Sequence, residues 1–529
     1  MKIEIVKKYK VVHTWTGILS SIMLFIAFYA GALAIFKPEI TAWTQAGIHV
    51  QAGSPDVDAL ARAFFSEQTA PVDKPMLVLP NREDPTARML YTAQGERRAA
   101  YLDHEGRLHD LAAPAEGKDV GSGRTTGDFV DDVHRAGGLP LDVETAEPII
   151  GIVSLLYAIA LVSGVVALLP SLVKDLFLLR ITHNVKRMWL DLHNMLGLTS
   201  LPFHIVMALT AAVFGLHHLI FDAQDVTIYP QGLKSYEAIS AKKSEPAPSA
   251  IALQPLQPLQ PSQLIAGLKE TVPGFTPTAI RYMMPGKEGQ TGKARVQGSD
   301  DRHFLRAGRF GLATLDLGTG QILDTTYLPG KQTPMAATLS SFFGLHFGNF
   351  GGLPVRILYI VLGVLGALVF YSGNLLWIEA RVKKSRPGQP LTTQPRHVRW
   401  LASLTVGMCL GCVTGLSCGI LAVRWFAASS MAPDAVASYA YHGVFIAYVA
   451  YAFACEAARA TAPLLGFSAI MAALIPLTTL VDSGYSGAYL PAYGLVEVFF
   501  TAIACLLFYL TLRARRRYRS GPRIFPAAA

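Results

Sequence analysis

The run LPVRILYIVLGVLGALVFYSGNLLW, residues 353–377, contains a single charged side chain, Arg356. Its length matches the roughly 20 residues that an α-helix needs to cross the ~30 Å hydrocarbon core of a bilayer. The whole chain shares this character, because 51% of its 529 residues are hydrophobic, 16% are charged and the mean hydropathy is +0.35. This composition excludes an ordinary soluble protein and predicts a membrane protein.

Seven other apolar runs have a similar length, so we predict a membrane all-α architecture of eight transmembrane helices. The predicted spans are 11–36, 148–169, 196–214, 353–377, 400–426, 439–455, 463–480 and 493–512. The first run follows a basic segment but is longer than the apolar part of a signal peptide. We therefore expect it to remain as an uncleaved membrane anchor.

Lysines and arginines gather at one set of span ends. They are Lys2, Lys7, Lys8, Lys10, Lys174, Arg180, Lys186, Arg187, Arg381, Lys383, Lys384, Arg386 and the tail RARRRYR at 513–519. The positive-inside rule assigns these ends, and with them both termini, to the cytoplasm. The formal charge of +9 then reflects membrane topology, and we expect no nucleic-acid binding.

Two long segments, 37–147 and 215–352, are predicted to lie on the other side of the membrane. Each contains a helix-like stretch and strand-like runs joined by a turn with aspartate, in AAYLDHEGRLHD (99–110) and LATLDLGTGQILD (312–324). We expect two small α+β domains, the second preceded by a Pro-rich linker at 244–263. The expected parts are 1–36 (tail and first helix), 37–147 (first domain), 148–214 (helices 2 and 3), 215–352 (second domain with its linker), 353–385 (helix 4) and 386–529 (four further helices).

Four histidines stand at the ends of the first four spans. His13 and His193 are expected at the cytoplasmic surface, and His134 and His346 at the outer surface. Two depth-matched pairs on neighbouring helices are what bis-histidine ligation of two haems requires. A single histidine at a membrane boundary is more typical of an interfacial anchor, but four histidines in two pairs favour a ligand role.

Glycines and arginines accompany these histidines. Gly17, Gly138 and Gly197 each follow a histidine by four residues, which on a helix places the glycine one turn away and leaves space for a porphyrin edge. Arg135 and Arg356 are candidates for pairing with the carboxylates of an outer haem. His204 is either a second ligand on the third helix or a residue that lines the haem cavity, and His217 is either an alternative ligand or a residue that meets only substrate or water.

The motifs HTWTGI, GALAIF, FVDDVHRAGG and DLHNMLGL, with the run at 345–377, resemble the PepSY-associated transmembrane proteins, which include inner-membrane reductases of ferric siderophores. The resemblance covers about residues 1–385. It implies a four-helix core with two b-type haems, two PepSY-like periplasmic domains, and electron transfer outward to a ferric siderophore. It also implies a bacterial inner-membrane location, while the role of the last four helices stays open.

The electron donor is expected to be a separate molecule, because the chain has no G-x-G-x-x-G motif after a strand and no flavin-sized cytoplasmic domain. A membrane quinol and a cytosolic flavoprotein are both compatible with this expectation. Two other functions stay open: a haem-free PepSY scaffold that regulates a periplasmic protease or sensor, and a transporter of the siderophore itself.

Overall fold

The computed structural model describes residues 3–45, 53–67, 73–80, 86–93, 96–112, 124–172, 185–228, 259–283, 292–306, 310–382, 394–426, 431–486 and 494–520. Within these residues, eight helices are long and apolar enough to cross a membrane, which confirms the predicted number. They are α1 (Ile3–Ala34), α5 (Val143–Leu168), α8 (Leu201–Thr227), α12 (Gly352–Arg381), α13 (Arg396–Trp425), α14 (Pro433–Ala454), α15 (Glu456–Ser486) and α16 (Gly494–Ser520). The chain is a multi-pass membrane protein.

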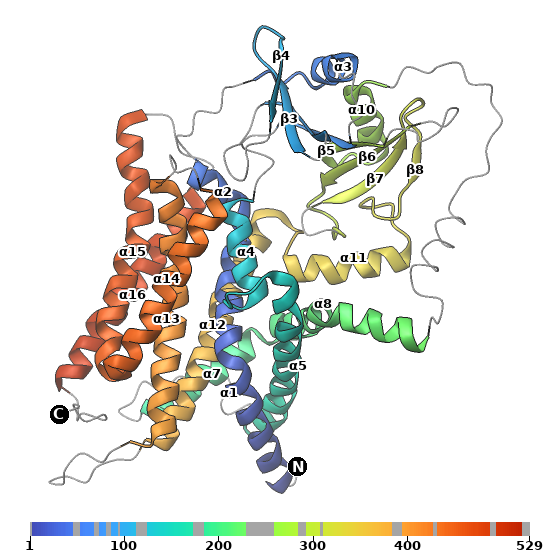
Figure 1. The fold of residues 1–529 in the computed structure, drawn as a ribbon. Coiled ribbons are helices and arrows are strands. Elements are labelled where there is room, and N and C mark those ends of the chain that lie inside the picture. The colour runs from blue at the N-terminus through green and yellow to red at the C-terminus, as the bar shows by residue number, and fades with distance from the viewer. Residues whose placement is uncertain are drawn as a thin grey trace, which may run out of the picture. The chain divides into compact units, whose positions relative to one another are not determined.

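The chain divides into two compact units (Figure 1). The first comprises Met1–Gly47, Arg124–Gly215 and Leu358–Ala529, and the second comprises Ile48–Gly123 and Leu216–Ile357. The first unit contains the spans, and the second contains all eight described strands. Most of the Pro-rich linker, and the loops with Lys174, Arg180, Lys383, Lys384 and Arg386, lie outside the described residues.

In the first unit, α1 packs against α5 and against the short helix α4 (Thr126–Ala136). Among the last four spans, α13 packs against α14 and α15 and is the most deeply buried of the eight, while α16 packs against α15. Four glycines recur on α13 at every fourth residue, Gly407, Gly411, Gly415 and Gly419, and a Cβ built at any of them would meet atoms of α14. Small residues at this spacing let two membrane helices approach closely, which explains the tight α13–α14 contact.

The predicted third span is interrupted. The helix α7 (Val185–Thr199) ends one residue before α8 begins, and Pro202 stands in the first turn of α8. Proline has no backbone N–H and its ring clashes with the preceding turn, so a break at this point is expected. The backbone bonds from Ser200 N to Leu196 O and from His204 N to Ser200 O keep the two helices connected.

The second unit contains one antiparallel sheet of eight strands in the order β4-β3-β2-β1-β5-β6-β7-β8. The segment 37–147 supplies β1 (Asp73–Val78), β2 (Arg88–Ala93), β3 (Glu96–Leu102) and β4 (Leu108–Ala112). The segment 215–352 supplies β5 (Thr276–Met283), β6 (Lys293–Ser299), β7 (Gly311–Asp316) and β8 (Ile322–Asp324). Both predicted hairpins are present, as β3–β4 and β7–β8.

The two segments do not form the two separate domains that the sequence predicts. Strand β1 pairs with β5, so the sheet is continuous through both segments. The helices α3 (Val57–Glu67) and α10 (Pro261–Thr271) cover one face of this sheet, as Figure 1 shows. Their buried leucines form one core with Leu77 of β1 and Ile280 of β5, and an apolar core shared by both halves is the physical reason for the joint unit.

Candidate cofactor site

The structure brings His13 and His193 together. His13 lies on α1 and His193 on α7, and their ring centroids are 6.1 Å apart. Metal–imidazole bonds are about 2 Å long and each centroid lies about 1 Å behind its nitrogen, so two imidazoles that share one metal ion have centroids about 6 Å apart. The observed separation therefore fits one iron between the two rings.

Both rings are held through their Nδ1 atoms. His13 Nδ1 donates to the carbonyl oxygen of Ala160 on α5 at 2.8 Å, and His193 Nδ1 lies 3.0 Å from the carbonyl oxygen of Val369 on α12. A carbonyl oxygen only accepts, so the proton of the neutral ring is on Nδ1 and the lone pair is on Nε2. Metal-binding histidines are oriented in this way by a second hydrogen bond.

The environment also favours the neutral form of His193, whose helix α7 precedes the third candidate span. Burial, with a smaller contribution from the neighbouring His13, lowers the pKa of His193 to about 4. The ring is then uncharged at pH 7, and the neutral imidazole is the form that coordinates iron.

His134 repeats this arrangement at the other end of α1. Its Nδ1 donates to the carbonyl oxygen of Ala27 at 2.7 Å. Ala27 follows His13 by fourteen residues on α1, which is about 21 Å along the helix axis. The first unit therefore holds two histidine sites at well-separated depths along α1.

Each of these three histidines also lies against a glycine of the helix that it contacts. The glycine is always four residues after the accepting carbonyl: Ala27 and Gly31 for His134, Ala160 and Gly164 for His13, and Val369 and Gly373 for His193. A helical side chain leans toward the preceding turn, so a side chain at this position would cover the carbonyl. We call this pair of positions the carbonyl–glycine seat.

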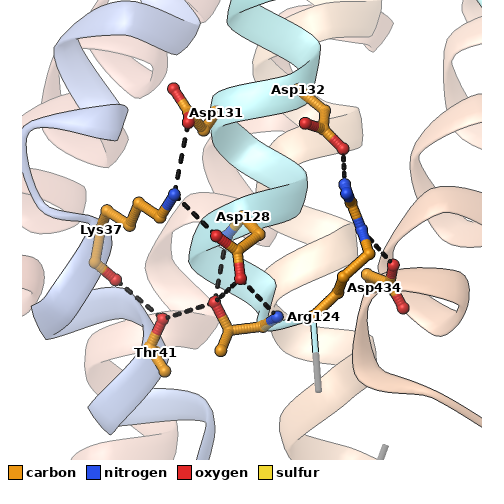
Figure 2. A network of polar contacts seen from close by, with 8 residues as sticks. Lys37, Thr41, Arg124, Asp128, Asp131, Asp132 and Asp434 are labelled. Carbon is orange, nitrogen blue, oxygen red and sulfur yellow. Dashed lines mark hydrogen bonds and ion pairs between the residues drawn. The ribbon is translucent and has the colours of Figure 1, made fainter. Parts of the chain in front are cut away.

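The helix that carries His134 is fixed by a polar network (Figure 2). Thr125 and Asp128 form a capping box at the start of α4. Lys37, at the start of α2 (Lys37–Gln45), contacts Asp128 at 2.6 Å and Asp131 at 3.3 Å. Arg124 lies between Asp132 of α4 and Asp434 of α14. These partly exposed pairs contribute modestly to stability, but together they fix the register of α4.

The other predicted site residues are placed as follows. His346 lies on α11 (Pro334–Phe347) and Arg356 in the first turn of α12, both in the second unit, so the pairing of His346 with His134 stays a prediction. His217 also belongs to the part of α8 in the second unit. Arg135 makes an ion pair with Glu147 of α5, which gives it a protein carboxylate as its partner where a haem carboxylate was expected.

The three predicted glycines differ in their surroundings. A Cβ built at Gly17 or Gly197 meets no atom of the described chain within 4 Å, so both leave open space beside their histidines. Gly138 lies beyond the end of α4 with φ of +76°, and it packs against Ile26 and the hydroxyl of Tyr441. The four-residue spacing therefore does not place Gly138 one helical turn above His134, because the helix has already ended.

The surroundings of His204 could not be predicted from the sequence. Its side chain is 1% exposed and lies among aromatic rings that include Phe28, Phe203 and Phe370. Its Nδ1 bonds the hydroxyl of Tyr157, and its Nε2 is buried with no hydrogen-bond partner among the described residues. Its role as a ligand or as a cavity residue stays open, although the aromatic surroundings favour the cavity role.

A family model described as the PepSY-associated TM region matches residues 11–380. The chain belongs to the PepSY-associated transmembrane family. The uncharacterized protein PA4219 of Pseudomonas aeruginosa is 24% identical over 245 residues, which are 44% of this chain and 57% of that protein. The three carbonyl–glycine seats lie within the family region, and α13 to α16 lie beyond it.

We predict that alanine at the seat glycines of this family member displaces the histidine rings. A Cβ at Gly164 would lie 2.8 Å from His13 Nδ1 and one at Gly31 would lie 2.9 Å from His134 Nδ1, whereas Gly373 leaves 3.3 Å to His193. In the two-haem protein that the sequence predicts, Gly164→Ala and Gly31→Ala should each lower haem per purified chain by about half, and Gly373→Ala should lower it less. Gly443→Ala on α14, where nothing lies within 4 Å, is the matched control and should keep full haem content.

Proposed function

We propose that the chain is a transmembrane oxidoreductase of the bacterial inner membrane that binds two haem b groups and reduces a periplasmic ferric siderophore, releasing Fe(II). The observation that carries the proposal is the pair of His13 and His193, with centroids 6.1 Å apart and each Nδ1 on a helix carbonyl. Both rings are half-buried, and the bond at each Nδ1 leaves the Nε2 atom of each ring as the possible metal ligand, which supports the proposal.

Haem b held between two imidazoles supplies reversible one-electron transfer. The chain holds the histidine ligands in place and leaves space for the porphyrin between the helices. His13 and His193 would hold one haem, with open space beside Gly17 and Gly197, and His134 with His346 would hold the other. The carbonyl acceptors Ala160 and Val369 keep the Nε2 lone pairs of His13 and His193 available for iron, and the carbonyl of Ala27 orients the ring of His134.

In this proposal both termini face the cytoplasm, because the basic ends of the spans gather there. The electron donor is a quinol or a cytosolic flavoprotein that reaches the His13 end of the bundle. The second unit then faces the periplasm, where ferric siderophore is available. The lipid bilayer insulates the two reactions from each other.

An absorption spectrum with a pyridine haemochrome assay tests the proposal directly. Full-length protein, purified in detergent, is expected to show a Soret band and two haems per chain. The control is the variant with alanine at His13, His134, His193 and His346, prepared in the same way, which should carry none. Wild-type protein without haem, or a quadruple variant with full haem content, would overturn the proposal.

A further inference from the structure

The face of the eight-stranded sheet opposite α3 and α10 carries an unusual pair of charges. Arg281 on β5 and Arg295 on β6 are direct cross-strand partners, so their side chains project from the same face about 5 Å apart at Cβ. Their neighbours Ile280 and Val296 are fully buried in the core under α3 and α10. Because successive residues of a strand alternate, the two arginines stand on the face opposite the helices.

The first half of the sheet has a basic residue at the position that corresponds to Arg295. Leu77 pairs with Ile280 at the centre of the sheet, so Val78 and Arg281, each one residue later, occupy equivalent positions in the two halves. The partner of Val78 on β2 is Arg88, and the partner of Arg281 on β6 is Arg295. Lys293, two residues before Arg295, is exposed on this face as well. Arg88 is 5% exposed, so the accessible cations of this face are Lys293 and Arg295 of β6 together with the half-buried Arg281 of β5.

Protein carboxylates do not neutralise the arginine pair. Among the described residues neither Arg281 nor Arg295 has an ion pair, and Arg281 Nε is buried without a hydrogen-bond partner. Two aspartates of the same face are held in turns: Asp316, the cross-strand partner of Lys293, accepts from the backbone N–H groups of Gly318 and Thr319, and Asp324 accepts from that of Thr326. Like charges directly opposite each other on a sheet are destabilising, and an anion between them removes that cost.

We propose that this face binds an anionic ferric chelate, with Arg281 and Arg295 donating to its catecholate or carboxylate oxygens. Guanidinium groups match paired oxygen acceptors in geometry and charge, and Arg295 is exposed while Arg281 is half-buried, so the site is open on one side. The inference rests on the proposed function, because that function supplies the ferric siderophore as the ligand. The inference adds that the siderophore is anionic and that it binds at this face of the sheet.

Binding to full-length detergent-purified protein tests the inference, with a ferric tricatecholate as the anionic probe and an uncharged ferric trihydroxamate for comparison. Arg281→Gln and Arg295→Gln are each expected to raise the Kd of the anionic chelate at least tenfold and to leave the binding of the uncharged one unchanged. Affinity of the wild type for the anionic chelate should fall as salt rises. The thermal unfolding temperature of the free variants should be unchanged or higher, because a repulsion has been removed.

The matched control is Arg62→Gln on α3, which makes the same charge change on the helix side of this unit and should bind as the wild type does. Equal binding of the two chelates, unchanged Kd in both arginine variants, or equal weakening by Arg62→Gln would overturn the inference. Titration of the quadruple histidine variant separates the two proposals. Arginine-dependent binding without haem supports the surface even if the redox function fails, whereas haem-loaded protein with arginine-independent binding refutes the surface alone.

Discussion

Alanine at His13 and alanine at His193 are expected to remove one and the same haem and to leave the other in place. The two ring centroids are 6.1 Å apart, so in the proposed two-haem protein the loss of either ring would leave one iron with a single protein ligand. His134→Ala and His346→Ala should remove the other haem. In each variant the pyridine haemochrome assay should give about half of the wild-type haem per chain, and low-temperature spectra should show which component is missing.

Two matched controls sharpen this prediction. His442 on α14 also bonds a carbonyl through Nδ1, but the carbonyl belongs to Ser438 of its own helix, so His442→Ala should keep both haems. His204→Phe should also keep both if His204 only lines the cavity among its aromatic neighbours. If His204→Phe and His13→Ala deplete the same component while His193→Ala is silent, the pairing of His13 with His193 is wrong.

The eight spans could be predicted because the constraint on them is local. A helix that crosses the hydrocarbon core must be apolar along about 20 consecutive residues, and no remote contact alters that requirement. The same holds for the β3–β4 and β7–β8 hairpins, because a few adjacent residues determine their turns around Asp103 and Asp316. Pro202 is also a local signal for the break between α7 and α8. The apolar run around it is continuous, however, so the sequence predicts a single span at 196–214.

The joined sheet could not be predicted in this way. Leu77 and Ile280 are neighbours in space but about 200 residues apart in the chain, and alternation within each strand says only that one face is buried. Two separate four-stranded halves and one eight-stranded sheet have the same local pattern. The pairing of β1 with β5 emerges only from the shared core under α3 and α10.

The seats of the histidines illustrate a similar limit. The sequence directed attention to Gly17, Gly138 and Gly197, which follow the ligands on their own chain segments. The glycines in contact with the rings are Gly31, Gly164 and Gly373, on the facing helices. Their signal is the recurrence of AFYAG, ALVSG and VFYSG, in which the residue with the accepting carbonyl precedes glycine by four residues. Without knowing which helix faces which histidine, this pattern is indistinguishable from ordinary small-residue packing.

Reduction of an external chelate is expected to require both histidine sites in series. His13 and the carbonyl that holds His134 are about 21 Å apart along α1, and a porphyrin at each site would extend toward the other. The remaining gap should permit electron tunnelling through a packed bundle without a moving part. A single site lies near one end of α1 only, so electron transfer between the two ends should need both sites.

The measurement uses sealed vesicles with the donor enclosed on the cytoplasmic side and a ferric chelate outside. His13→Ala, His193→Ala and His134→Ala should each lower chelate reduction to the rate of vesicles without protein, a far larger effect than the loss of half the haem. Adding a chemical reductant outside should restore reduction in the variants at His13 and His193 but not in the variant at His134, because only the first two retain the outer site. His442→Ala vesicles should reduce the chelate at the wild-type rate. If His193→Ala vesicles still pass electrons from the enclosed donor at that rate, the serial arrangement is refuted, and the 6.1 Å pair must serve a purpose other than transmembrane electron transfer.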